Sequence, residues 1–244
     1  MFQKSKNGAA APDGKRFYAI GDIHGAADAL DRLIDRIDAE KAGDVTKELV
    51  FLGDYVDRGP DSKGVIERLI AIGAEFPGSV FLKGNHEAVM LDFLNDPEEM
   101  LEWLEWGGDE TLRSYGVSGA LTKSGEDLSA ELASAMPKAH LDFLNNLSLT
   151  HQAGDYLFVH AGVRPGVALK DQSEDDLLWI RKRFHDANAK DRPDFTVVHG
   201  HHPMKKPVDV GWRIGVDTGA CWSGVLTAAV LEGKTRRFIA SDSR

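Results

Sequence analysis

The chain has 244 residues, enough for one α/β domain with local insertions, and its 42% hydrophobic and 28% charged residues exclude a disordered or fibrous protein. A formal net charge of -10 disfavours sequence-independent binding to nucleic acid, and a single cysteine, Cys221, excludes an intrachain disulfide. No apolar run approaches the ~20 residues that cross a bilayer, and none near the start has the length of a signal-peptide core, so we expect a cytoplasmic protein with no membrane partner.

The first part of the chain alternates strand-like and helix-like segments. Residues 1–14 are small and polar and include Pro and Gly, which predicts a flexible tail before a domain that spans 15–244. Three apolar runs follow, FYAI, ELVFLGDY and SVFL. Two stretches with apolar residues at helical spacing separate these runs. This repeated β-α-β pattern predicts a sheet of parallel strands with right-handed crossovers.

The middle of the chain has a different pattern. Residues 91–149 contain amphipathic helical segments broken by Gly and Pro, and we expect an inserted helical cap there. The stretch from Asp92 to Glu131 is strongly acidic, which is typical of a solvated helix face. After this cap, short strand-like runs predict a second, largely antiparallel sheet: YLFVH, FTVVH, RIGVD, VLTAAVLE and RRFIA.

Polar residues of metal-ligand type follow several of the apolar strands. Three strands end in turns that contain glycine, and two later strands end in histidine: GDIHG, GDYVDRG, KGNHE, LFVHAG and VVHGHH. Each signal is weak alone, because a Gly-Asp pair after a strand is usually a turn and a lone histidine is usually structural. Ligands of open α/β sheets bind outside the carboxyl ends of strands, so these side chains should converge. Together they predict a divalent metal site, and carboxylate plus imidazole without thiolate suits Mn, Fe, Zn or Ni.

These strings, in this order, are similar to those of the phosphoprotein phosphatase family, within the calcineurin-like metallophosphoesterases. With the later string IGVDTGACWSGVLT, the resemblance runs from Phe17 to about Glu232 and is strongest to small bacterial and bacteriophage serine/threonine phosphatases. The symmetrical diadenosine tetraphosphatases are related to the same group. The resemblance implies a four-layer α/β/β/α sandwich that holds two divalent metal ions, with Mn²⁺ the expected metal.

The resemblance also implies a role for each motif residue. The implied metal ligands are Asp22 and His24 for the first ion, Asp54 as a bridge, and Asn85, His160 and His201 for the second. A water shared between the two ions would lose its proton near neutral pH and attack phosphorus in line. The implied catalytic residues are His86 as general acid, Asp57 as the carboxylate that raises its pKa, and Arg58 and Arg181 as phosphate clamps.

The roles of several neighbouring residues stay open. Glu87 is either a hydrogen-bond partner of the metal ligands or a first-turn glutamate favoured by the helix dipole. His199 shares a strand face with His201 if that strand extends far enough. His202 stands where the family usually has threonine, and it is free to contact substrate or metal. Arg183 competes for the role of the second clamp.

The leading hypothesis for function is hydrolysis of phosphomonoesters, with phosphoserine and phosphothreonine in proteins as substrates. The alternative is symmetrical cleavage of dinucleoside polyphosphates, in which the DRG and GNHE motifs tend to become ARG and GNHD, and this sequence has neither change. Phosphodiester or nucleic-acid cleavage is disfavoured by the net charge and by Pro203, which replaces a further metal histidine of the broader superfamily. A pseudoenzyme is disfavoured because every ligand position holds a competent residue. Phosphotyrosine stays open because a shallow two-metal site discriminates weakly.

Overall fold

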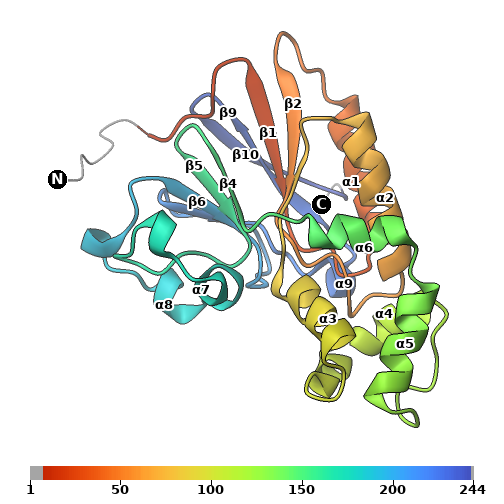
Figure 1. Ribbon diagram of the computed structural model, residues 1–244. Helices are drawn as coiled ribbons and strands as arrows, with labels where there is room; N and C mark the ends of the chain where they lie inside the picture. Colours follow the sequence, from red (N-terminus) through yellow and green to blue (C-terminus); the bar gives the residue numbers. More distant parts are fainter. Residues whose placement is uncertain (1–7, 243–244) are drawn as a thin grey trace.

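The computed structural model describes residues 8–242, and the strands of this range form two five-stranded sheets that face each other (Figure 1). Helices α1 (Ala27–Ala39) and α2 (Ser62–Glu75) cover the outer face of one sheet. Helices α7 (Glu174–Trp179) and α8 (Lys182–His185) cover the outer face of the other. This arrangement is the predicted α/β/β/α sandwich.

The first sheet has the strand order β10-β9-β1-β2-β3. Its strands are β1 (Lys15–Ile20), β2 (Thr46–Phe51), β3 (Val80–Phe81), β9 (Thr227–Glu232) and β10 (Thr235–Ala240). β1 pairs in parallel with β2, and β2 with β3, as the β-α-β pattern predicts. The crossover helix α2 begins after Asp61, whose side chain accepts the Gly64 N–H at 2.8 Å and caps the helix.

The second sheet has the strand order β4-β5-β6-β8-β7. Its strands are β4 (Thr150–Ala153), β5 (Tyr156–Val159), β6 (Thr196–His199), β7 (Val208–Asp209) and β8 (Arg213–Gly215). The expectation of a largely antiparallel sheet is wrong, because β5, β6 and β8 pair in parallel. The last two strand-like runs are β9 and β10, and they join the first sheet antiparallel to β1 and to each other. β9 lies between β10 and β1, and its residues are buried almost throughout because the layers on both faces of the sheet cover them.

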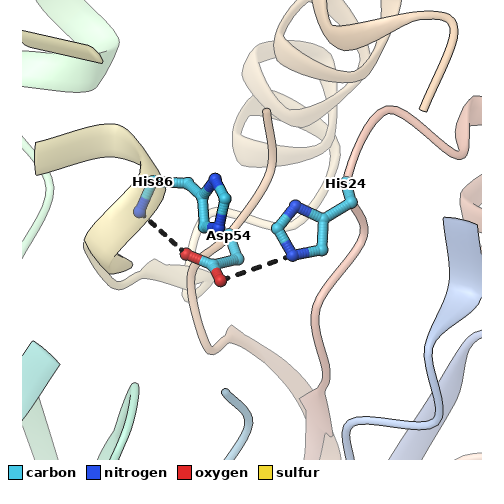
Figure 2. A group of neighbouring side chains, drawn as sticks. All are labelled: His24, Asp54 and His86. Carbon is cyan, nitrogen blue, oxygen red and sulfur yellow. Dashed lines mark hydrogen bonds and ion pairs between the residues drawn. The ribbon is translucent and has the colours of Figure 1, made fainter. Parts of the chain in front are cut away.

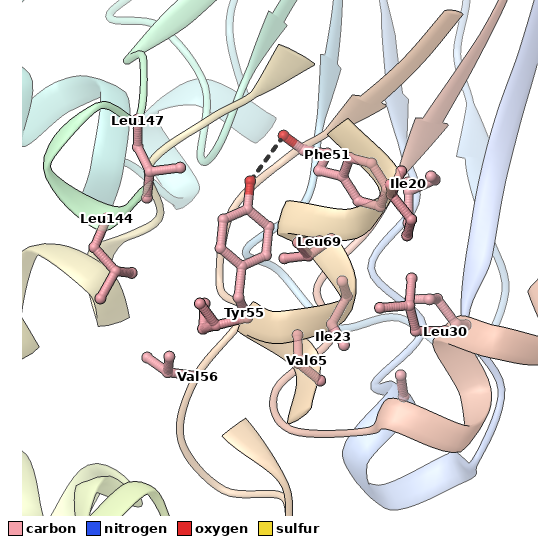
Figure 3. Close-up of a cluster of buried hydrophobic side chains, with 14 of the residues drawn as sticks. Ile20, Ile23, Leu30, Phe51, Tyr55, Val56, Val65, Leu69, Leu144 and Leu147 are labelled. Atoms are coloured by element: carbon pink, nitrogen blue, oxygen red, sulfur yellow. Dashed lines mark hydrogen bonds between the residues drawn. The ribbon is translucent and has the colours of Figure 1, made fainter. Parts of the chain in front are cut away.

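The alternation of side chains along β1 explains the layers. Tyr18 and Ile20 belong to a core cluster shared with the outer helices, whereas Phe17 and Ala19 belong to a cluster shared with the second sheet. Figure 3 shows part of the helix-side cluster, in which Tyr55 lies between the sheet and the helices. A third cluster joins the second sheet to α7 and α8. Three apolar layers therefore hold four structural layers together.

Most of the chain between β3 and β4 is helical. Its helices are α3 (Asn85–Asn95), η1 (Leu101–Trp106), α4 (Gly108–Ser114), α5 (Gly125–Ala135) and α6 (Lys138–Asn145). η1 is a 3₁₀ helix within a segment where a helix was expected, and α4 was not predicted because it is too short to show periodicity. The remaining short helices are η2 (Leu169–Asp171), η3 (Ala189–Asp191) and α9 (Ala220–Ser223). No helix in the described part of the chain is long and apolar enough to cross a bilayer.

Part of the expected N-terminal tail is docked onto the domain. Ala11 is buried, and its N–H donates to the Gly233 carbonyl at 2.8 Å. The Ala10 N–H donates to Asp155 Oδ2 at 3.0 Å. Residues 10 and 11 are therefore bonded to the domain, and the predicted boundary after residue 14 stays a prediction. The first seven residues lie outside the described part of the chain.

Candidate metal centre

Loops from both sheets meet at one edge of the sandwich, beyond the carboxyl ends of the parallel strands. The His24 N–H donates to the Asp54 carbonyl at 2.9 Å, which joins the loops after β1 and β2. The Gly200 N–H donates to the His160 carbonyl at 2.9 Å, which joins the loops after β5 and β6. The predicted site residues that are buried there are Asp22, His24, Asp54, Asp57, Asn85, His86, His160 and His201.

His24, Asp54 and His86 form a first group, in which one ligand atom of each residue lies within 4.8 Å of the others (Figure 2). His24 Nε2 is 3.4 Å from Asp54 Oδ2, and Asp54 Oδ1 accepts the His86 backbone N–H at 3.1 Å. His24 Nδ1 must donate to the Val56 carbonyl at 2.7 Å, so its Nε2 lone pair is directed into the group. Burial lowers the pKa of His24 to about 3, which keeps the ring neutral and able to bind a cation.

Asp54 also belongs to a second group, with His160 and His201. His160 Nδ1 donates to the Leu52 carbonyl at 2.8 Å, so its Nε2 carries a lone pair. His160 Nε2 is 2.9 Å from Asn85 Oδ1 and 3.4 Å from Asp54 Oδ1. Three acceptor atoms this close repel one another unless a cation lies among them. His201 Nδ1 is 2.9 Å from Asn85 Oδ1, and its buried Nε2 has no hydrogen-bond partner. This donor set therefore fits a divalent metal ion.

Two further carboxylates lie beside these groups. Asp22 accepts the His201 N–H with both oxygens, at 3.1 and 3.0 Å, and Asp217 is likewise buried. Burial, with the charges of Asp217 and Asp54, raises the pKa of Asp22 well above its usual value. A cation would relieve this crowding of negative charge. The first group contains His86 where Asp22 was expected. Asp217 was missed in the sequence, although it follows strand β8 as the other candidates follow theirs.

His86 and Asp57 form a buried pair. His86 Nδ1 donates to Asp57 Oδ2 at 2.7 Å. The same oxygen accepts the Trp103 Nε1–H at 2.8 Å, and Asp57 Oδ1 accepts the Thr111 hydroxyl at 2.7 Å. Burial acts to lower the pKa of His86, but the charges of Asp54 and Asp57 outweigh it and the pKa is raised. Helices η1 and α4 thus orient the His86 ring through Asp57, and no motif in the sequence pointed to Trp103 or Thr111.

The two predicted arginines differ in their surroundings. Arg58 lies against the first group, where its two terminal nitrogens donate to His24 Nε2 at 2.7 Å and to His86 Nε2 at 2.8 Å. Arg181 is exposed. The pKa of His201 is lowered by burial, by His160 and by the charge of Arg181. Arg58 therefore lies beside the first group of ligand atoms, where a planar guanidinium can bind phosphoryl oxygens, whereas the clamp role of Arg181 stays a prediction.

Comparison with known families decides the class of this centre. Residues 15–224 match the family model of the calcineurin-like phosphoesterases. The chain belongs to this family. It is therefore a hydrolase of the phosphoesterase type, and the groups of ligand atoms at the strand ends agree with a metal-dependent member.

The phosphoesterase is similar to curated proteins of two kinds. It is 30% identical over 149 residues to a symmetrical bis(5'-nucleosyl)-tetraphosphatase of Dechloromonas aromatica, covering 61% of this chain and 44% of that protein. It is 26% identical over 225 residues to serine/threonine-protein phosphatase 1 of Salmonella typhimurium, covering 91% and 94%. A solved structure of a provisionally named diadenosine tetraphosphatase has a TM-score of 0.66 at 23% identity, covering 97% of this chain and 100% of that one. This structural likeness shows the shared fold.

Glu87 of the phosphoesterase holds the loop that carries Asp54. Its Oε2 accepts the Asp54 and Gly84 N–H groups, both at 2.9 Å. Its Oε1 accepts the N–H groups of Tyr55 at 2.7 Å and Val56 at 3.2 Å. Burial and the charge of Asp54 raise the pKa of Glu87 to about 7, although these backbone donors oppose the shift. Both roles left open by the sequence are realised, because Glu87 also occupies the first turn of α3.

The backbone of the phosphoesterase is left-handed at several non-glycine positions, and within residues 8–242 all of them are predicted site residues. These positions are His24 (φ 47°), Asp54 (φ 55°), Asp57 (φ 71°), Arg58 (φ 68°) and His201 (φ 62°). Left-handed residues let the chain reverse sharply directly after a strand, so the side chain of the turn itself faces the centre.

His199 and His202 lie outside the two groups of ligand atoms in the phosphoesterase. Strand β6 ends at His199, whose ring packs edge-on against Phe184 with centroids 5.2 Å apart, on the helix side of the second sheet. The left-handed turn at His201 breaks the alternation, so these two residues do not share a face. The centroid of the His202 ring lies 4.6 Å from that of His185.

Proposed function

We propose that this phosphoesterase hydrolyses phosphomonoesters, with phosphoserine and phosphothreonine in proteins as its preferred substrates. The observation that carries the proposal is the buried pair of His86 and Asp57, at 2.7 Å, beside the groups of ligand atoms. A serine or threonine alkoxide is a poor leaving group, and it requires a proton as its bond to phosphorus breaks. A nucleoside diphosphate leaves readily as an anion and needs such an acid much less.

The same proposal includes two divalent cations, with Mn²⁺ the expected metal. Asp54 would serve both, because it belongs to both groups of ligand atoms. When bound, the cations would supply a water nucleophile at neutral pH and neutralise charge on the phosphoryl oxygens. The other proposed ligands are Asp22 and His24 for one cation and Asn85, His160 and His201 for the other.

The proposed roles of the remaining side chains follow from their contacts. Arg58 would exchange its two imidazole acceptors for two phosphoryl oxygens, and Arg181 would bind the phosphoryl group from the side of His201. With Arg58 drawn to the phosphate, His86 Nε2 is free to take up a proton while its Nδ1–H stays bonded to Asp57. That proton would pass from Nε2 to the leaving oxygen.

Symmetrical cleavage of dinucleoside polyphosphates is the second candidate, and the resemblance to the Dechloromonas tetraphosphatase supports it. A comparison of kcat/KM separates the two, with purified protein and Mn²⁺ offered a phosphothreonine peptide or diadenosine tetraphosphate. We expect the peptide to be preferred. A tenfold or greater preference for diadenosine tetraphosphate, about 1.4 kcal/mol in transition-state free energy, would replace the first candidate with the second.

The acid role of His86 has a separate test. His86→Ala should keep its metal content and lose about 10²- to 10⁴-fold in turnover of the phosphothreonine peptide, with a smaller loss on p-nitrophenyl phosphate. His151→Ala is the matched control, because His151 is a partly buried histidine of β4 outside the centre. Equal losses on the two substrates would show that His86 binds phosphate in the ground state and does not donate the proton.

A further inference from the structure

The guanidinium of Arg58 is bonded to both histidines of the first group of ligand atoms. His24 Nδ1 donates to the Val56 carbonyl, so its Nε2 carries a lone pair. His86 Nδ1 donates to Asp57, so its Nε2 carries one as well. Arg58 Nη1 donates to the first of these lone pairs at 2.7 Å, and Arg58 Nη2 donates to the second at 2.8 Å. One guanidinium therefore uses both imidazole lone pairs of this group.

The same lone pairs are what the first group offers to a divalent cation. Ligand atoms of His24, Asp54 and His86 lie within 4.8 Å of one another, and the two rings meet edge-on with centroids 4.6 Å apart (Figure 2). A metal ion binds the lone pair of a neutral imidazole, and one lone pair accepts either an N–H group or a metal ion. A cation bound to His24 and the contact between Arg58 and His24 are therefore mutually exclusive.

Arg58 also brings positive charge to the buried carboxylates beside this group. Burial raises the pKa of Asp22 and of Asp217, and the charge of Arg58 opposes both rises. Like charges repel strongly at short range in a buried site, so a divalent cation that joins Asp22 would face the guanidinium. The side chain that compensates these carboxylates thus opposes the entry of a metal ion.

Only the side chain of Arg58 has to move in order to release the histidines. Its backbone N–H donates to the Gly107 carbonyl at 3.1 Å, which fixes the turn. Its guanidinium carbon lies 5.4 Å from the ring centroid of Trp222, an indole that is 65% exposed. Cation–π attraction acts within about 6 Å of the ring centroid and requires no hydrogen bond, so the guanidinium can turn from the imidazoles and keep this contact.

We propose that Arg58 is an internal competitor for the first metal ion, the one assigned to Asp22 and His24, and that this ion binds when the guanidinium leaves His24. The inference rests on the two-metal centre proposed above and adds a step to its assembly. It predicts that removal of this side chain tightens metal binding, whereas removal of a ligand such as Asp54 weakens it. A phosphoryl group that draws the guanidinium away should favour loading in the same way.

Calorimetric titration with Mn²⁺ in a phosphate-free buffer measures this competition without turnover. Arg58→Ala should lower the Kd of the first ion about 10- to 150-fold, the range for one hydrogen bond to a charged group. The same gain should appear in a His201→Ala background, which lacks a proposed ligand of the second ion. An unchanged or weaker affinity in Arg58→Ala would refute the competition.

Two further variants separate competition for lone pairs from simple repulsion between charges. Arg58→Lys keeps the charge, but a compact ammonium cannot span two imidazoles, so the Kd should still fall roughly threefold or more. Arg181→Ala removes another positive charge, one that acts on His201, and should change the Kd of the first ion by less than about threefold. If Arg58→Lys matches the unmodified protein, or Arg181→Ala gains as much as Arg58→Ala, charge alone is responsible and the proposal fails.

The titrations also separate this inference from the proposed hydrolase function. A protein that shows the expected affinities but does not hydrolyse phosphate esters would refute the hydrolase and support the competition. An active protein in which Arg58→Ala leaves the Kd unchanged would do the reverse. If neither the unmodified protein nor Arg58→Ala binds Mn²⁺, both the metal centre and the competition are disproved.

Discussion

Replacement of Glu87 by glutamine tests whether this buried side chain organises the centre. The carboxylate accepts four backbone N–H groups, two on each oxygen, and one of these is the N–H of Asp54. Glutamine keeps one oxygen, so its amide NH₂ faces two N–H donors that lose their acceptor. Each buried unsatisfied group costs about 1–3 kcal/mol, which gives roughly 2–6 kcal/mol for the free energy of unfolding.

For a chain of this size, that loss corresponds to a fall in Tm of about 4–24 °C. Thermal unfolding should be followed in the presence of a chelator, because bound cations would add stability to the folded state and hide the difference. Metal affinity, measured separately, should fall about 10- to 100-fold as the Asp54 loop loosens. Glu131→Gln is the control, since this exposed glutamate pairs only with Lys123 at the surface. A Tm and a metal affinity for Glu87→Gln that match those of the control would show that Glu87 does not hold the loop.

Three other substitutions test neighbouring contacts. Asp54→Ala should lose both metal ions and activity together, because Asp54 belongs to both groups of ligand atoms; two bound metals in elemental analysis would disprove the bridging role. Trp103→Phe removes the N–H bonded to Asp57 and should lower kcat for the phosphothreonine peptide more than for p-nitrophenyl phosphate, so equal effects would contradict a role through His86. Gly84→Ala places a methyl group against the backbone and carboxylate of Asp54 and should reduce both Tm and metal content, which normal values would refute.

The sequence predicted the first parallel strands, and it placed the candidate ligand residues after them, because both are local signals. An apolar run followed by Gly-Asp or Gly-Asn contains the strand, the turn and the candidate ligand within a few residues, as at Asp54 and Asn85. The pairing of β9 with β1 is not local, since Ala229 lies opposite Ala19 across most of the chain. The almost continuous burial of β9 follows from an apolar run that identifies a strand but not the neighbour of that strand.

The supports of the site could not be predicted for a related reason. Trp103 and Thr111 reach Asp57 from helices 46 and 54 residues further along the chain, and neither lies in a motif that carries chemistry by itself. Asp217 differs, because the rule that found the other candidates also applies to it. It lies two residues after strand β8, as Asp22 lies two residues after β1, and only its place in a late, weakly patterned run concealed it.

The concentration of left-handed backbone at the centre has a consequence for how the protein opens. Each such residue costs about 1–3 kcal/mol relative to ordinary backbone, and Arg58 has the least natural tolerance for it among the five. Without cations, this strain and the crowded acceptors favour local opening of the strand-end turns ahead of the sheets. Amide hydrogen exchange should therefore be fastest in those turns in the metal-free protein and slow sharply on metal addition, while the amides of β1 and β9 hardly change.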